Sequence, residues 1–78
     1  MGAKKSYVVV SFHTTNDAMA VADVAGTAGL SGRLAPIPRQ ISAGCGLAWI
    51  EPAENRTRIV DLVRQNDLEY AGIDLLDL

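Results

Sequence analysis

Four short segments of the chain carry the apolar, β-branched and aromatic residues that are typical of strands. The first is residues 6–12 (SYVVVSF), in which Val8, Val10 and Phe12 share one face. The other three segments are residues 31–37 (SGRLAPI), residues 46–50 (GLAWI) and residues 69–78 (EYAGIDLLDL). Pro36 and Pro38 end the second strand, because proline donates no ladder hydrogen bond. We expect Ile73 and Leu75 to point inward from the last strand.

Two other segments show the apolar spacing of helices. In residues 14–29, Thr14, Thr15 or Asn16 can cap a helix whose inner face is a stripe of small residues, and Gly29 ends it. In residues 53–67, one apolar stripe faces inward, and Asn66 is expected to be a left-handed C-cap. The apolar positions of the two helices are Ala18, Val21, Ala22, Ala25 and Ala28 in the first, and Ile59, Leu62 and Val63 in the second.

The predicted order of elements is βαββαβ. This order is the ferredoxin-like pattern of the α+β class, in which a four-stranded antiparallel sheet carries two helices on one face. The alternative is an open α/β layer with a different strand order. A chain of 78 residues is expected to form a single domain over 1–78, since two cores would each be too small to be stable. Any site should therefore be shallow or shared with a partner.

Composition excludes several classes of function. The formal net charge is −2 and the seven basic residues are scattered, so nucleic acid is not an expected partner. No apolar run approaches the roughly 20 residues of a membrane span, and no signal sequence is evident, so we expect a cytoplasmic protein without a membrane partner. One cysteine and one histidine cannot build a disulfide or a structural zinc site, and no cofactor or metal is expected.

The single cysteine lies in residues 36–49 (PIPRQISAGCGLAW), between Gly44 and Gly46. In the predicted sheet the third strand runs antiparallel beside the first, so Cys45 should lie near His13 and the start of the first helix. A helix N-terminus and a nearby cation such as Arg39 favour a thiolate. The glycines leave backbone amides free to approach the sulfur, and Ser42 can add a hydroxyl. The pattern suits a nucleophilic or carrier thiol.

Each of these residues also has a purely structural interpretation. Cys45 can be a small buried apolar residue, His13 can cap the first helix or face solvent, and Arg39 can be a solvated loop residue. Gly44 and Gly46 can serve only a turn that needs positive φ. Trp49 is expected to pack in the core or to form a dimer contact across the open face of the sheet.

Three segments resemble one known family. These are "YVVVSFHTTNDAM", "GLSGRLAPIPRQISAGCGLAW" and "LEYAGI", which extend from about Tyr7 to Ile73. They are similar to small proteins described as selenium or sulfur carrier-like, and the "PRxISAGCGLA" pattern is the most specific part. Gln40 is the one departure in that segment, where an acidic or small polar residue is more usual. The resemblance implies a ferredoxin-like domain whose Cys45 carries sulfur or selenium.

Two functions are therefore open. In the first, the protein is a carrier rather than a stand-alone enzyme, which holds sulfur or selenium on Cys45 as a persulfide or selenosulfide and delivers it to an acceptor enzyme. Its partners are donor and acceptor proteins, and a homodimer is possible. In the second, the chain is a non-catalytic protein- or anion-binding module with an incidental thiol. Redox sensing is a weaker third, since no resolving cysteine is encoded.

Overall fold

A computed structural model of the protein describes residues 5–42 and 44–78. Within these ranges the chain forms strands, two α-helices and one turn of 3-10 helix. In chain order the elements are β1 (Ser6–Ser11), α1 (Thr15–Thr27), β2 (Arg33–Pro36), β3 (Leu47–Pro52), η1 (Ala53–Asn55), α2 (Arg56–Gln65) and β4 (Gly72–Asp77).

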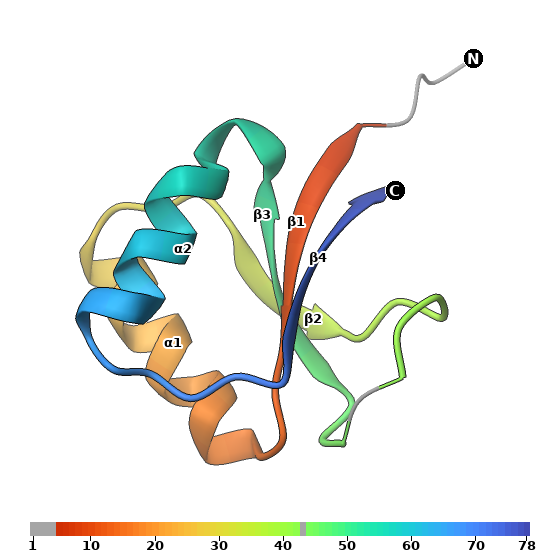
Figure 1. The fold of residues 1–78 in the computed structure, drawn as a ribbon, viewed down its shortest axis with the longest axis horizontal. Helices are drawn as coiled ribbons and strands as arrows, with labels where there is room; N and C mark the ends of the chain where they lie inside the picture. Colours follow the sequence, from red (N-terminus) through yellow and green to blue (C-terminus); the bar gives the residue numbers. More distant parts are fainter. Residues whose placement is uncertain (1–4, 43) are drawn as a thin grey trace.

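The strands form one antiparallel sheet in the order β2-β3-β1-β4. Both helices lie on the same side of this sheet (Figure 1). The expected α+β, ferredoxin-like arrangement is therefore confirmed, and the alternative with another strand order is wrong. The central pair, β1 and β3, runs antiparallel with Val10 opposite Trp49, which brings the end of β1 beside the start of β3. This pairing positions the turn formed by residues 44–46, the cysteine turn.

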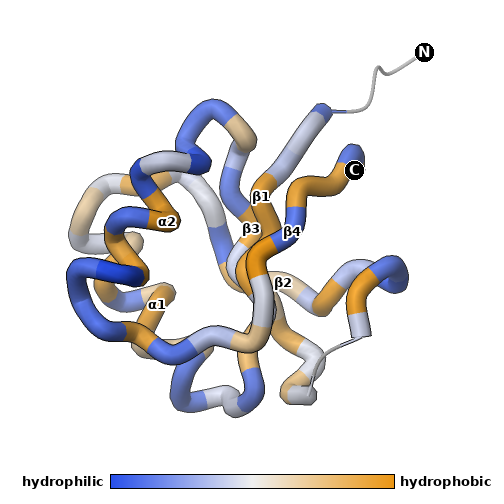
Figure 2. Tube along the Cα trace, in the orientation of Figure 1, coloured by the Kyte–Doolittle hydropathy of each residue, from blue (hydrophilic) through white to orange (hydrophobic). Residues whose placement is uncertain are grey.

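The core lies between the sheet and the helices. Val8, Val10 and Phe12 of the first strand segment are fully buried, as their shared face predicts. The helices meet them with the expected apolar stripes, and Figure 2 shows the hydrophilic colours concentrated on the outer sides of α1 and α2. The buried helix residues are Ala18, Val21 and Ala25 in α1 and Ile59, Leu62 and Val63 in α2.

The helix ends show one correct and one incorrect expectation. Thr14 caps α1, and Gly29 (φ 78°) ends it as expected. In α2 the left-handed residue is Asp67 (φ 51°) and not Asn66, whose φ is −100°. Asn66 instead donates its side-chain amide to the carbonyl oxygen of Leu62 at 2.8 Å. The turn at α2 is thus one residue later than expected, because Asn66 satisfies a terminal carbonyl through its side chain.

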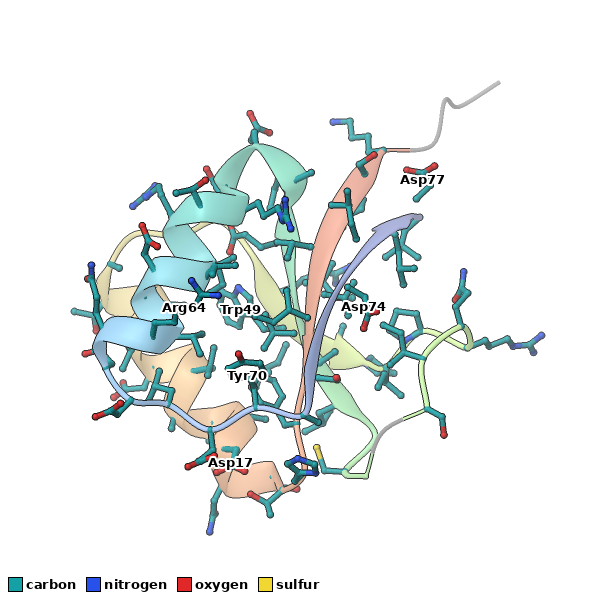
Figure 3. The ribbon with its side chains drawn as sticks, in the orientation of Figure 1. Asp17, Trp49, Arg64, Tyr70, Asp74 and Asp77 are labelled. Carbon is teal, nitrogen blue, oxygen red and sulfur yellow. The ribbon has the colours of Figure 1, made fainter. Side chains whose placement is uncertain are left out.

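One further expectation about the sheet is wrong, and for Trp49 the first of its two alternatives, packing in the core, is confirmed. Leu75 lies opposite the buried Val8 but is 56% exposed, since β4 is an edge strand and the chain leaves this part of it uncovered. Trp49 packs in the helix-side core, only 5% exposed, so it cannot form a contact across the open face. Figure 3 shows Trp49 on the same side of the sheet as the helices.

Candidate thiol site

The cysteine turn lies beside Phe12 and His13, which connect β1 to α1. The backbone N–H of Cys45 donates to the carbonyl oxygen of Phe12 at 3.4 Å. A Cβ added to Gly44 would lie 3.1 Å from the carbonyl oxygen of His13, so these two backbones are in close contact. The place expected for Cys45, beside His13, is the place observed. It follows from the antiparallel pairing of β1 and β3.

The thiol itself lies at the edge of the core. Cys45 is a free, half-buried cysteine, and its Sγ donates to the carbonyl oxygen of Leu47 at 3.8 Å. It also packs against the buried apolar cluster. A carbonyl oxygen accepts only from the protonated thiol. The sulfur must therefore turn away from Leu47 before it can react as a thiolate.

The two flanking glycines differ in what they do. Gly46 has a φ of 77°, a left-handed conformation that other residues adopt only with strain. Its carbonyl oxygen accepts from the N–H of Ile37 at 2.9 Å, which closes the base of the loop that leaves β2. Both Gly44 and Gly46 are exposed, so no side chain on either neighbour shields the sulfur from solvent.

Arg39 and Ser42 lie further along the same loop. Both are exposed, and Arg39 stands in a turn in which the N–H of Ile41 donates to the carbonyl oxygen of Pro38 at 3.0 Å. The loop projects from the sheet on the side opposite the helices (Figure 1), and its tip is hydrophilic (Figure 2). No hydrogen bond within residues 5–42 and 44–78 joins Arg39 or Ser42 to Cys45. Within the described residues, the hydrogen bonds of Cys45 thus go to Phe12 and Leu47 and not to these two side chains.

At the N-terminus of α1, residues of the chain itself already accept a backbone N–H and offset the helix dipole. Thr14 Oγ1 accepts from the N–H of Asp17 at 3.1 Å, so Thr14 and not His13 is the cap. Asp17 adds a carboxylate in the first turn, where it offsets the positive end of the helix dipole. His13 is exposed in the bend before the helix. His13 is thus free to meet solvent or a partner beside the cysteine turn.

Sequence reasoning missed one buried polar group, Glu51 at the far end of β3. Its side chain is fully buried and accepts four hydrogen bonds. The donors are Trp49 Nε1 at 2.8 Å, Asn55 Nδ2 at 2.8 Å, the N–H of Gly32 at 3.1 Å and Ser31 Oγ at 3.4 Å. The signal was present in the sequence, since Trp49 and Glu51 share a strand face and a buried indole N–H needs an acceptor.

Residues 5–42 and 44–78 contain neither a metal-binding cluster nor a membrane-spanning helix. No group of three or more His, Cys, Asp or Glu side chains is arranged there to hold a metal ion. None of the helices in that part of the chain is long and apolar enough to cross a membrane.

Comparison with known proteins gives one match. A family model described as "Putative Se/S carrier protein-like" matches residues 7–73, which include β2, β3, both α-helices and Cys45. No curated protein and no solved structure matches the chain. Because the family model covers most of the sequence, the chain belongs to the Se/S carrier protein-like family.

Proposed function

We propose that the protein is a sulfur or selenium carrier that holds the transferred atom on Cys45 and delivers it to an acceptor enzyme. The observation that carries this proposal is the setting of the thiol: Cys45 is the only cysteine, half-buried, and lies between two exposed glycines. The backbone around it is fixed by hydrogen bonds to Phe12 and Ile37, while the side facing solvent is open. Family membership supports the same role.

The transfer step needs no cofactor. The thiolate of Cys45 attacks the outer sulfur of a donor persulfide, R–S–SH. A new S–S bond forms at Cys45, the donor's S–S bond breaks, and its electron pair leaves on the donor thiolate, R–S⁻. The carrier then holds Cys45–S–SH, and an acceptor thiolate repeats the same exchange to release it. A selenosulfide, R–S–SeH, reacts in the same way through its selenium.

The single thiol suits storage. A second cysteine nearby would attack the inner sulfur of the adduct and convert it into an internal disulfide, and the sequence encodes none. Gly44 and Gly46 admit a partner's active-site loop, and Arg39, Ser42 and His13 present polar groups to that partner on the same loop and in the adjoining bend. The partners are donor and acceptor proteins in the cytoplasm, where thiols remain reduced. The protein is an accessory carrier and not a stand-alone enzyme.

Loading can be tested by mass spectrometry of the intact protein after incubation with glutathione persulfide. We expect a gain equal to the mass of one sulfur atom at Cys45, which disappears when a thiol acceptor is added. Cys45→Ser must remain unmodified. A parallel sample unfolded in denaturant gives the reactivity of the same cysteine without the turn.

The outcome separates the two functions. A persulfide that forms on the folded protein and is returned to the acceptor supports the carrier. No adduct on the folded protein, with normal loading of the unfolded chain, would mean that the thiol is incidental and that the chain is a binding module. A mixed disulfide with glutathione would also contradict the carrier: there Cys45 attacks the inner sulfur of the donor, the outer sulfur leaves as hydrosulfide, and no sulfur remains to be passed on.

A further inference from the structure

The face of the sheet away from the helices carries side chains in cross-strand rows. Direct partners in an antiparallel sheet point to the same face, so the register defines each row. The middle row, from β2 to β4, is Arg33, Ile50, Val9 and Asp74. The row nearer the cysteine turn is Ala35, Ala48, Ser11 and Gly72, and the row on the other side contains Pro52, Tyr7 and Leu76.

The two halves of this face differ in cover. Ala48 and Ser11 are buried although no helix lies on this side, and the loop between β2 and β3 projects here (Figure 1). The other half is less covered by the described residues, although Val9 in its middle row is fully buried. It contains a hollow of about 380 Å³ whose lining includes Tyr7, Ile50 and Pro52. One half of the face is thus covered by the chain itself, and the other presents half-buried apolar side chains to solvent.

Opposite charges mark the two ends of the middle row. Arg33 stands on the β2 edge and Asp74 on the β4 edge, both exposed. Three strand spacings of about 4.8 Å separate them by roughly 14 Å, too far for a direct ion pair. Figure 3 shows Asp74 on the side of the sheet away from the helices, whereas Arg64 lies on the helix side. Ile50 and Val9 fill the row between the charges.

We propose that this half of the open face binds a second copy of the chain around a two-fold axis parallel to the strands, between β3 and β1. In a symmetric dimer each contact occurs twice, so the surface must complement itself. This operation places Arg33 opposite Asp74 of the second copy, and Asp74 opposite its Arg33. It also places Tyr7 of one copy opposite Pro52 of the other. Leu76 on β4 of one copy then lies over the β2–β3 side of the other, which contains the hollow.

A two-fold axis that lies in the plane of the interface but perpendicular to the strands does not give this complementarity. It would place Arg33 opposite Arg33 and Asp74 opposite Asp74, which like-charge repulsion disfavours. The charges therefore favour the two-fold axis parallel to the strands over the one perpendicular to them.

The size of the face predicts a weak dimer. Four strands about 4.8 Å apart, over about five residues of length, give roughly 300 Å² of sheet per copy. Stable interfaces bury about 800 Å² per partner. We therefore expect a transient dimer with a dissociation constant on the order of 100 µM, which weakens as salt screens the two ion pairs.

Sedimentation equilibrium of the whole chain, up to about 1 mM, tests the proposal. The wild type should show a monomer–dimer equilibrium. Arg33→Glu, and separately Asp74→Arg, should each raise the dissociation constant about tenfold, because each change creates two repulsive contacts per dimer. The double variant Arg33→Glu/Asp74→Arg exchanges the charges and should return the dissociation constant to within about threefold of the wild type.

Arg64→Glu is the matched control, since it makes the same charge change on the exposed surface of α2. It should leave the dissociation constant unchanged, and circular dichroism should show every variant folded. A wild type that remains monomeric at about 1 mM overturns the proposal. So does a double variant that dimerises no better than the single ones, or a control that weakens the dimer as much as Arg33→Glu.

Discussion

The two ends of β3 differ in how their polar groups are used. At one end, Glu51 is fully buried and accepts hydrogen bonds from Trp49, Gly32, Asn55 and Ser31. At the other, the thiol of Cys45 is half-buried and makes one long hydrogen bond, to the carbonyl oxygen of Leu47 at 3.8 Å. A network with every donor satisfied stabilises a fold, whereas a group with few partners remains available for reaction.

The contrast predicts that changes at the Glu51 end cost stability and that changes at the Cys45 end cost much less. Four substitutions test this difference between the two ends, and their expected effects on the free energy of unfolding decrease from Glu51 to Cys45.

Glu51→Leu should have the largest effect. The apolar side chain leaves the indole N–H of Trp49, the amide of Asn55 and the N–H of Gly32 without their acceptor, and we expect a loss of about 3 kcal/mol. Urea denaturation measures it. Glu51→Gln is the control, because it retains one acceptor oxygen and should lose only about 1 kcal/mol. Equal losses in the two variants would show that volume, and not hydrogen bonding, is what Glu51 supplies.

Gly32→Ala should come next, because Gly32 packs against the same network. An added Cβ would meet Glu51 Oε1 and would lie 2.7 Å from Trp49 Nε1. We expect a loss of about 2 kcal/mol, again from urea denaturation. Gly26→Ala is the matched control in α1, where nothing lies within 4 Å of the added atom and alanine should stabilise the helix by up to about 1 kcal/mol. A Gly32→Ala variant as stable as the wild type would mean that β2 and β3 can separate without cost.

Gly46→Ala should cost about 1 kcal/mol, since the site has space but its φ of 77° strains any residue with a Cβ. The shift in the thermal midpoint measures this loss. A loss as large as that of Gly32→Ala would show that the cysteine turn is as tightly packed as the Glu51 end, which would contradict the comparison.

Cys45→Ser should have the smallest effect, within about 1 kcal/mol, because the thiol is only half-buried and its single hydrogen bond is long. The melting temperature should therefore stay close to that of the wild type. A loss of several kcal/mol would assign Cys45 to the core, as a structural residue.

Most of the fold followed from the sequence because local pattern and topology agree. The alternation in residues 6–12 and the order βαββαβ fixed β1, its pairing with β3 and the position of Cys45 beside His13. The errors lie where one local side-chain hydrogen bond, or the place of a strand at the edge of the sheet, decides the outcome. Asn66 binds Leu62 through its side chain, and Leu75 has the spacing of a buried residue but lies on an edge strand.

The surroundings of the thiol were harder to predict than its position. Strand pairing places Cys45, but nothing in the spacing of residues sets the direction of the loop between β2 and β3, which projects on the side away from the helices (Figure 1). Asp17 lies in the first turn of α1, where its carboxylate offsets the positive end of the helix dipole that was expected to favour the thiolate. The third strand was predicted to end at Ile50, so Glu51 fell outside it. The strand in fact continues to Pro52, opposite Tyr7, and this places Glu51 in the core.

Alkylation of Cys45 by iodoacetamide in the native protein tests most directly whether the thiol is available without unfolding. The rate should lie within about tenfold of the rate for the unfolded chain, and it should be the same in Glu51→Leu as in the wild type, because access does not pass through the unfolded state. A rate that is suppressed by several orders of magnitude, and that rises in Glu51→Leu in proportion to the lost stability, would show that Cys45 reacts only after unfolding. That result would contradict the conclusion that Cys45 reacts independently of the stability of the Glu51 end, and with it the proposed carrier function.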